Sequence, residues 1–357
     1  MKQLQVGLED RAYPILIREG LLSEVGEELK LRKIAKRYII IADDHVAELF
    51  GGQLVESLRK VNIPVDLLTF PRGEASKNLT TIGRLISNLA QLGVDRQDAL
   101  IALGGGVTGD ITGFAAAIYM RGIPFVQVPT TLLAQVDSSV GGKTGVDIPE
   151  GKNLVGCFYQ PKAVFIDTLV LDQLPREELL NGLAEVVKYG VINDLDFFNF
   201  LLSNQKDILA LEPAIVEAVI AHCCTIKARV VEADEREADQ RRILNYGHTL
   251  GHAVEAASNF TIPHGMAISM GMVAVNTIAV GKGLLAAEKA QRVKDGLQGF
   301  GLPVAIPPEL DRRQMTELLK SDKKSVGGRP FFVLPIQIGK VIISDEVDDA
   351  LIARAFG

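Results

Sequence analysis

The sequence has no tryptophan, and only three cysteines and five histidines in 357 residues. The cysteines, Cys157, Cys223 and Cys224, form no Cys-x-x-Cys pair. Their number and spacing therefore give neither a disulfide framework nor a cysteine-based zinc motif. We expect reduced thiols with a structural role, as in a cytosolic protein.

The chain also lacks a long apolar run and an excess of positive charge. Residues 1–4, Met-Lys-Gln-Leu, do not begin an apolar run of the secretory type. The longest apolar stretch, residues 266–280, contains Ser269 and Asn276 and is too short to cross a bilayer, so it predicts a buried helix. The net charge of −6 argues against a nucleic-acid surface, which needs a basic face. These absences predict a soluble, cytoplasmic protein with no membrane or nucleic-acid partner.

The length of the chain and a change of pattern near its middle predict two domains. A chain of 357 residues exceeds the usual size of one hydrophobic core. In the first half, short apolar runs alternate with amphipathic stretches, which predicts a parallel sheet covered by helices. The expected strands are residues 37–42, 98–103, 124–129 and 163–167, with helices at 53–60 and 79–92.

Helical periodicity dominates after residue 174. The expected helices are residues 177–192, 214–233, 248–257, 266–281 and 286–299, and residues 331–335 and 341–344 predict a small hairpin. We therefore expect an α/β domain at residues 1–175 and a mainly α-helical domain at residues 176–357.

A glycine-rich turn directly follows the second expected strand. Its Gly-x-Gly-x-x-Gly pattern is formed by Gly104, Gly106 and Gly109. Such glycines let the backbone approach a pyrophosphate, whose charge meets the N-terminus of the next helix. About twenty residues on, where an acid usually binds the ribose, Ile123 and Pro124 stand instead, whereas Asp43 and Asp44 end an earlier strand. A nucleotide site of unusual topology and a plain tight turn both remain open.

Three of the five histidines, His248, His252 and His264, lie within seventeen residues. Histidine is the commonest metal ligand, and His248 and His252 share one helix face. Thr249 stands where zinc proteases of the His-Glu-x-x-His type carry glutamate, so this is not their motif. Two histidines on one face are also common as hydrogen-bonded core residues, which is the alternative to a metal site.

Spacing does not identify a third ligand, although a catalytic zinc needs three protein ligands and one open position. Glu255 shares the helix face of His248 and His252. Glu185 lies in a mostly apolar helix, where a carboxylate is costly unless it is paired or bound to a metal. Glu185 and Lys188 also have the spacing of a helical ion pair. Both acids remain candidates.

Several basic residues lie in settings other than ordinary solvated faces: in glycine turns, in an apolar helix, close to the histidines or at the expected end of a helix. They are Lys143, Lys152, Lys188, Arg241, Lys323 and Lys324. Each alone is more often a surface charge. Together they suggest a pocket for a substrate with phosphate and carboxylate groups.

These segments, in this order, resemble the 3-dehydroquinate synthase family of the sugar-phosphate cyclase superfamily. The matching motifs are PRGEASK at 71–77, LGGGVTGD at 103–110, VPTTLLAQVDSSVGGK at 128–143, GKN at 151–153, GLAEVVK at 182–188, NYGHTLGH at 245–252, HG at 264–265 and DKK at 322–324. They span nearly the whole chain, and the block at 128–143 is highly specific.

The resemblance implies a zinc site formed by Glu185, His248 and His264, and therefore not by Glu255. The metal would be Zn²⁺ or another divalent ion such as Co²⁺. For His252 the resemblance implies proton transfer or a hydrogen bond to substrate.

The resemblance also implies an NAD site in the first domain and a substrate site that includes residues of the second. The implied NAD-binding residues are Asp44, Arg72, Gly73, Glu74, Ala75, Ser76, Lys77, Gly105, Gly106, Val107, Thr108, Gly109, Asp110, Thr130, Thr131, Asp137, Lys143, Lys152, Leu171, Asp172 and Gln173. The implied substrate residues are Arg121, Lys143, Lys152, Asn153, Lys188, Lys227, Arg241, Asn245 and Lys323 or Lys324. In this family an arginine like Arg121 reaches the neighbouring subunit, so a homodimer is expected.

The activity implied is conversion of 3-deoxy-D-arabino-heptulosonate 7-phosphate to 3-dehydroquinate and phosphate in the shikimate pathway. The implied sequence is transient oxidation by NAD, phosphate elimination, re-reduction and intramolecular aldol closure. Three alternatives are a cyclase whose substrate lacks the carboxylate, a metal-dependent alcohol dehydrogenase of related fold, and a catalytically inactive binding protein.

Overall fold

The computed structural model describes residues 2–321 and 330–357. The chain divides into two compact units, Met1–Leu174 with Val216–Glu232, and Pro175–Ile215 with Ala233–Gly357. We call them unit 1 and unit 2. The junction between Leu174 and Pro175 lies beside the expected domain boundary. The segment Val216–Glu232, which was expected in the second domain, belongs to unit 1 instead. The NAD-binding and metal-binding roles of the two domains stay predictions, and Lys323 and Lys324 lie outside the described residues.

Unit 1 is built on a seven-stranded sheet. Its strands, in spatial order, are β1 (Lys2–Val6), β2 (Tyr13–Ile17), β9 (Val164–Ile166), β6 (Phe125–Pro129), β5 (Ala99–Gly104), β3 (Tyr38–Asp43) and β4 (Val65–Phe70). All neighbours pair in parallel except β1 and β2. The predicted parallel α/β fold is therefore confirmed, and β1, β2 and β4 extend it beyond the four expected strands.

Helices and a separate two-stranded ribbon complete unit 1. The helices are α1 (Val25–Arg32), α2 (Asp44–Val46), α3 (Gly52–Lys60), α4 (Leu79–Gln91), α5 (Gly106–Ile118) and most of α9 (Pro213–Ala233), and the ribbon is β7 (Lys143–Ile148) with β8 (Gly151–Phe158). Short turns of helix are η1 (Glu9–Arg11), η2 (Leu21–Glu24), η3 (Ala47–Gly51), η4 (Glu74–Ser76), η5 (Tyr119–Arg121), η6 (Ala134–Ser138) and η7 (Thr168–Gln173).

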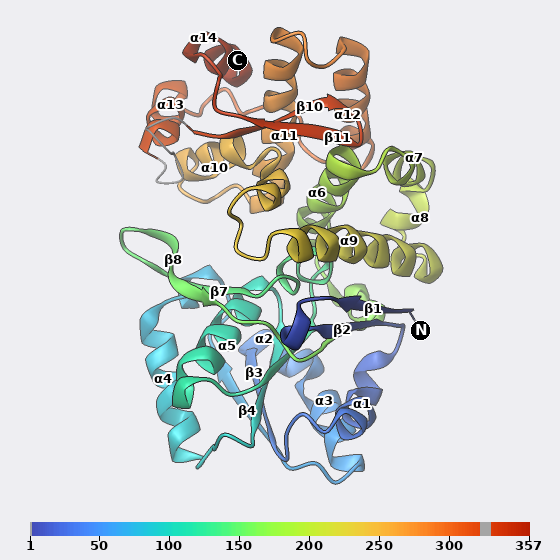
Figure 1. The fold of residues 1–357 in the computed structure, drawn as a ribbon, viewed down its shortest axis with the longest axis vertical. Helices are drawn as coiled ribbons and strands as arrows, with labels where there is room; N and C mark the ends of the chain where they lie inside the picture. The colour runs from blue at the N-terminus through green and yellow to red at the C-terminus, as the bar shows by residue number, and fades with distance from the viewer. Residues whose placement is uncertain (1, 322–329) are drawn as a thin grey trace. The chain divides into compact units, whose positions relative to one another are not determined.

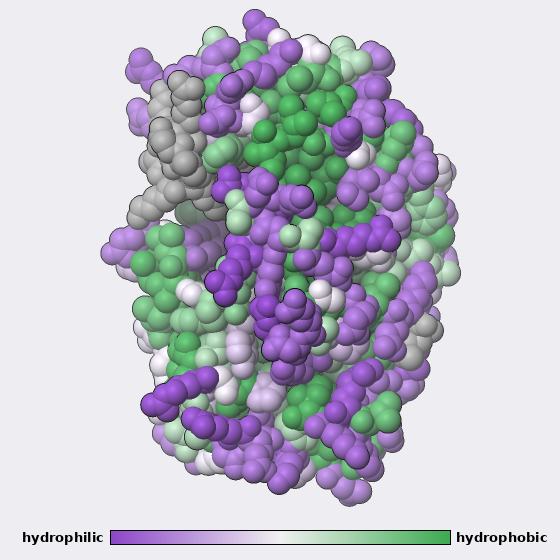
Figure 2. Space-filling view, viewed as in Figure 1, coloured by the Kyte–Doolittle hydropathy of each residue, from purple (hydrophilic) through white to green (hydrophobic). Residues whose placement is uncertain are grey.

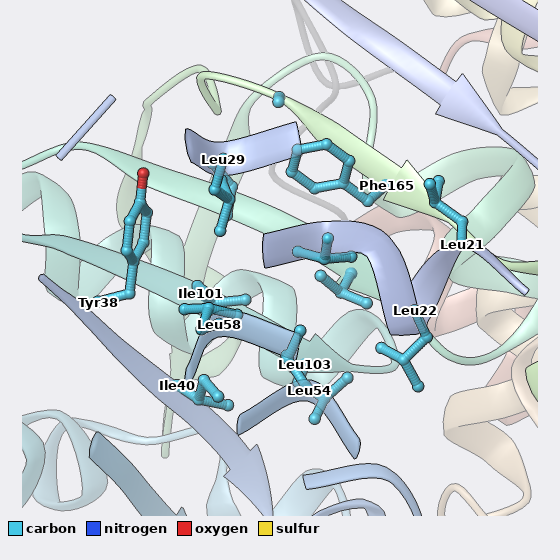
Figure 3. Close-up of a cluster of buried hydrophobic side chains, with 14 of the residues drawn as sticks. Leu21, Leu22, Leu29, Tyr38, Ile40, Leu54, Leu58, Ile101, Leu103 and Phe165 are labelled. Carbon is cyan, nitrogen blue, oxygen red and sulfur yellow. The ribbon is translucent and has the colours of Figure 1, made fainter. Parts of the chain in front are cut away.

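The sheet is buried on both faces, because alternate strand residues point to opposite sides. On one face Ile40 and Ile101 pack with residues of α1 and α3 (Figure 3). On the other face Ile39 and Leu100 pack with residues of α4 and α5. Figure 1 shows these two pairs of helices on the two sides of the strands. Double burial explains why the strands are continuous apolar runs in the sequence.

The order of the strands creates a switch point between β3 and β5. From β3 the chain adds β4 on one side, and it then adds β5, β6 and β9 on the other. In open parallel sheets, ligands bind beyond the carboxyl ends of the strands at such a point. Asp44 follows β3, and Gly105 follows β5. The acid and the glycine turn, which are far apart in the sequence, therefore end neighbouring strands.

Unit 2 is mainly helical, as the periodicity predicts. Its helices are α6 (Arg176–Asn193), α7 (Leu195–Ser203), α8 (Gln205–Leu209), η8 (Gln240–Asn245), α10 (His248–Ala257), α11 (His264–Gly281), α12 (Ala287–Gly299), α13 (Arg312–Ser321) and α14 (Asp349–Phe356). The expected hairpin is β10 (Phe332–Gln337) with β11 (Lys340–Ser344). The sequence did not predict α7, α8 and α14, whereas α13 lies where a helix was expected to end, directly before Asp322.

One helix of the described residues, α11, is by length and composition able to cross a membrane, so the expectation that this stretch is too short was wrong. However, 67% of its apolar window is buried inside the protein, as in the core helix of a soluble protein. Figure 2 shows hydrophilic side chains over much of the visible face, interspersed with areas of hydrophobic side chains. These observations are consistent with a soluble protein.

Helices α1 and α3 touch at the backbone, which gives a test of the fold. A Cβ atom at Gly26 of α1 would lie 2.0 Å from the Ser57 carbonyl oxygen of α3, whereas one at Gly83 of α4 would meet nothing within 4 Å. We expect Gly26→Ala to lower the free energy of unfolding by about 1–3 kcal/mol through overpacking. The control Gly83→Ala should raise it by up to about 1 kcal/mol. Urea unfolding midpoints measure both, and equal shifts would contradict the close packing of α1 and α3.

Candidate metal and nucleotide sites

Three helices of unit 2 bring the expected metal ligands into one cluster. Glu185 comes from α6, His248 and His252 from α10, and His264 from α11. Glu185 Oε1 lies 3.4 Å from His248 Nε2 and 3.7 Å from His264 Nε2. One nitrogen from each of the three histidines lies within 4.8 Å of the others. We call these four side chains the metal cluster.

Two glycine contacts explain how the helices meet there. A Cβ atom at Gly265 would lie 2.1 Å from the Asn181 carbonyl oxygen, so the first turn of α11 rests directly on α6. The Gly265 amide also donates to Asn181 Oδ1 at 2.5 Å. Gly247 has φ +79° and would clash with Met272 if it carried a side chain. These close approaches place His264 beside α6 and start α10 at His248.

Hydrogen bonds orient the two imidazoles that face Glu185. His248 Nδ1 lies 3.1 Å from the Tyr246 carbonyl oxygen, which can only accept, so Nδ1 carries the hydrogen. His264 Nδ1 lies 3.3 Å from Glu255 Oε2. Both Nε2 atoms are then turned toward Glu185. Neither hydrogen bond was predicted, and Glu255 entered the sequence analysis only as an alternative metal ligand.

The charges in the metal cluster are strongly coupled. Glu185 and Lys188 form an ion pair through Oε2 and Nζ, and both side chains are almost completely buried. Burial lowers the pKa of His248 well below its usual value. At His264 burial acts in the same direction, but the nearby carboxylates of Glu185 and Glu255, the second of which is hydrogen-bonded to Nδ1, outweigh it and raise the pKa to about 9. Without a metal, a proton on His264 therefore supplies positive charge beside Glu185.

The donor chemistry fits a divalent metal ion. Imidazole nitrogens and a carboxylate oxygen are the ligand types of catalytic zinc sites. Glu185 Oε1 and the Nε2 atoms of His248 and His264 form one such set, and the three histidines form another. The geometry brings together all the residues of both sets, so the assignment of Glu185 rather than His252 as third ligand stays a prediction.

Single substitutions distinguish the two ligand sets. We expect His248→Ala and Glu185→Gln to lose bound zinc, because each removes a ligand, whereas His252→Ala should keep it. Zinc per chain, measured by atomic emission after dialysis, gives the answer. Loss of zinc from His252→Ala with retention in Glu185→Gln would favour the three-histidine set.

The expected substrate residues Arg241 and Asn245 lie in η8, in the same unit as the metal cluster. Arg241 is buried, and its Nη1 donates to the Glu235 carbonyl oxygen at 2.5 Å. The Asp234 carboxylate accepts backbone N–H groups from residues 238, 239 and 241 at 2.8–3.0 Å. These hydrogen bonds outweigh desolvation and lower the pKa of Asp234. Asp234, which the sequence did not identify, thus fixes the loop that carries Arg241.

In unit 1 the glycine turn is packed against the expected NAD-binding residues. Gly105 is the N-cap of α5, and Thr130 N donates to the Gly104 carbonyl oxygen at 3.0 Å. A Cβ atom at Gly105 would lie 3.1 Å from Thr131 Cγ2. Glycine at this position therefore lets Thr131 pack closely beside the N-terminus of α5, the part of a helix that favours an anion.

Residues 71–77 contact residues at the same switch point. The Arg72 amide donates to Asp44 Oδ1 at 3.1 Å. Lys77 Nζ lies 2.6 Å from Asp110 Oδ2, on the first turns of α5. Burial acts to lower the pKa of Lys77, but Asp110 and Glu74 outweigh it and raise the pKa, so Lys77 carries a positive charge.

Helix α9 contributes the expected substrate residue Lys227 to unit 1. Its Nζ lies 2.8 Å from Oδ1 of Asp137, an expected NAD-binding residue, and 2.7 Å from the Asp137 carbonyl oxygen. Cys224, one turn earlier, donates to the Gln135 carbonyl oxygen at 3.2 Å. Because most of α9 belongs to unit 1, an expected substrate residue, Lys227, contacts an expected NAD-binding residue, Asp137.

The remaining expected residues of unit 1 lie on the ribbon and on short helices. Lys143, Lys152 and Asn153 lie in β7 and β8, and Asn153 N donates to Asp147 Oδ1 at 2.7 Å. Leu171, Asp172 and Gln173 end η7.

Arg121 is not brought to the glycine turn. It is exposed and has φ +68° in η5, which follows the last residue of α5. The 13 residues of α5 separate it from the turn. At 1.5 Å per residue this separation is about 20 Å.

The ion pair of Lys77 and Asp110 gives a test of unit 1. Their side chains are 6% and 20% exposed, against 65% and 67% for the surface pair Lys60 and Glu56. We expect Lys77→Met to lower the free energy of unfolding by about 3 kcal/mol, because it leaves a carboxylate unpaired. Lys60→Met should cost less than about 1 kcal/mol. Urea unfolding compares the two, and equal losses would refute the importance of the buried pair.

The fold, the metal cluster and the residues packed around the glycine turn are typical of a nucleotide- and metal-dependent enzyme. The chain superposes on a crystal structure of 2-deoxy-scyllo-inosose synthase complexed with carbaglucose-6-phosphate, NAD⁺ and Co²⁺, with a TM-score of 0.92, 31% identity and 99% coverage of both chains. It also matches 2-epi-5-epi-valiolone synthase from Streptomyces hygroscopicus with NAD⁺ and Zn²⁺ bound (TM-score 0.88, 29% identity, 96% and 95% coverage).

Family models described as the N-terminal and C-terminal parts of 3-dehydroquinate synthase match residues 67–181 and 182–325. The 3-dehydroquinate synthase of Desulforamulus reducens is 45% identical, with 98% of each chain covered. That of Thermodesulfovibrio yellowstonii is 46% identical, with 97% of each chain covered. The chain therefore belongs to the 3-dehydroquinate synthase family, as the sequence motifs predicted.

Proposed function

We propose that the chain is a 3-dehydroquinate synthase, which converts 3-deoxy-D-arabino-heptulosonate 7-phosphate to 3-dehydroquinate and phosphate. The observation that carries this proposal is identity of 45–46% with relatives of that name over nearly the full length of both chains. The metal cluster and the glycine turn support it, because the reaction needs both an oxidant and a polarising group.

The proposed cofactors are NAD and Zn²⁺. Bound at the switch point between β3 and β5, NAD would supply the oxidant that takes a hydride from C5 while the C5 hydroxyl loses its proton, which leaves a ketone, and it would return the hydride to C5 later. Zinc held by Glu185, His248 and His264 would act as a Lewis acid on the C5 oxygen. Because the hydride returns within each turnover, no net NADH forms.

The chemistry of the substrate explains the order of events. A ketone at C5 makes the C6 hydrogen acidic, so phosphate can leave by β-elimination, with one of its own oxygens as the base. After C5 is reduced again, the ring opens. An intramolecular aldol addition then closes the carbocycle.

The side chains of this protein bind and orient the substrate in the proposal. Lys152 and Asn153 hold the phosphate, and the Arg241 guanidinium binds the carboxylate through two hydrogen bonds. His252, whose ring centroid lies 5.3 Å from that of His248, transfers a proton to or from a substrate hydroxyl.

We also propose that the protein is a cytoplasmic homodimer. Arg121 supports the dimer, because it is exposed and the length of α5 separates it from the glycine turn of its own unit. An arginine in that position can serve the site of a second copy. The absence of a disulfide among the three cysteines is consistent with the cytoplasm.

Phosphate release from 3-deoxy-D-arabino-heptulosonate 7-phosphate, with catalytic NAD⁺ and zinc, tests the proposed activity. We expect far more phosphate than NAD⁺ supplied, formation of dehydroquinate, and no increase in absorbance at the NADH band. Accumulation of NADH would indicate a dehydrogenase.

Glucose 6-phosphate, which lacks the carboxylate, is the matched comparison. Its turnover in place of the heptulosonate would indicate a cyclase of the type represented by the structurally similar inosose synthase.

A further inference from the structure

Glu255 is a buried acid beside the metal cluster that the proposed ligand set leaves without a role. It lies on α10, seven residues after His248 and three after His252, so all three share one helix face. Its side chain is 10% exposed. A buried carboxylate at this position needs a partner, because desolvation of an isolated charge is expensive.

The partner of Glu255 in the cluster is the outer nitrogen of His264. Glu255 Oε2 lies 3.3 Å from His264 Nδ1, while His264 Nε2 lies 3.7 Å from Glu185 Oε1. The two ring nitrogens of an imidazole point in different directions. A carboxylate that binds Nδ1 is therefore turned away from an ion held by Nε2.

This contact determines which nitrogen of His264 is available to a metal. A neutral imidazole has one N–H donor and one acceptor nitrogen. Since a carboxylate only accepts, Nδ1 keeps its hydrogen, so Nε2, on the side of Glu185, is the nitrogen that offers a lone pair when a metal replaces its proton. Carboxylates in this position also make the imidazole a more basic ligand.

We infer that Glu255 is a positioning residue that holds His264 with Nε2 directed at the metal. This inference rests on the proposed metal site. The two histidine ligands then differ, because His248 is held by a neutral carbonyl, that of Tyr246, and His264 by a negative charge. The charge should make His264 the stronger ligand.

Zinc affinity measures this role without any assay of catalysis. The dissociation constant for zinc alone is measured by competition with a chromophoric chelator in the parent chain, Glu255→Gln and Glu255→Ala. We expect Glu255→Ala to weaken binding 10–100-fold, as for other partners of metal-ligating histidines. Glu255→Gln should weaken it less, because its amide oxygen still accepts from Nδ1. The bands of bound Co²⁺ should shift in both variants.

Two controls calibrate the result. Glu288→Gln removes an exposed acid of unit 2, in the first turn of α12, and should leave the affinity unchanged. His248→Ala removes a proposed ligand and should abolish binding. If Glu255→Ala does not fold, the zinc affinity of the nearly isosteric Glu255→Gln tests the positioning role.

Parental affinity in both Glu255 variants would overturn the positioning role. If Glu255→Gln loses zinc binding as completely as His248→Ala, Glu255 is itself a metal ligand, and the positioning role is also overturned. A parent chain that binds no zinc would instead refute the proposed metal site, and this inference with it.

Discussion

The metal cluster depends on backbone contact among α6, α10 and α11. Gly265 rests on the carbonyl oxygen of Asn181, and a Cβ atom at Gly271 would lie 2.1 Å from the Gly247 carbonyl oxygen. Only glycine at these positions lets the three helices come so close. Residues on different helices, such as Glu185 and His264, then come within ligand distance of each other.

A buried group of charges is held together by this packing. Glu185 faces histidines with one oxygen and Lys188 with the other, and Glu255 lies on the far side of His264. Removing several charges from water is costly, and their mutual attraction offsets the cost only when the geometry is good. A divalent ion fits this arrangement because it adds positive charge beside the buried Glu185 carboxylate, on the side where the Nε2 atoms of His248 and His264 lie.

In unit 1 the relevant constraint is a different one, the approach of an anion to backbone amides. The reversal of strand order between β3 and β5 leaves their carboxyl ends open to a ligand. Glycine at 105 lets Thr131 pack beside the N-terminus of α5, and Lys77 and Lys227 bring positive charge to the surrounding residues. Helix α9 returns to unit 1 and supplies the second of these lysines.

The sequence by itself determined the parallel sheet, the main helices and the family, because apolar periodicity and the motif at residues 128–143 are local properties. It also named Glu185, His248 and His264, through the resemblance. Only the tertiary structure decided that Glu255 is the partner of His264, since this contact depends on the distance between α10 and α11, whereas the contact of His248 with the Tyr246 carbonyl oxygen is local to the turn that begins α10. Spacing along one helix face made Glu255 resemble a ligand. Its contact with Nδ1 of His264 depends on how α10 and α11 pack, which no local pattern encodes.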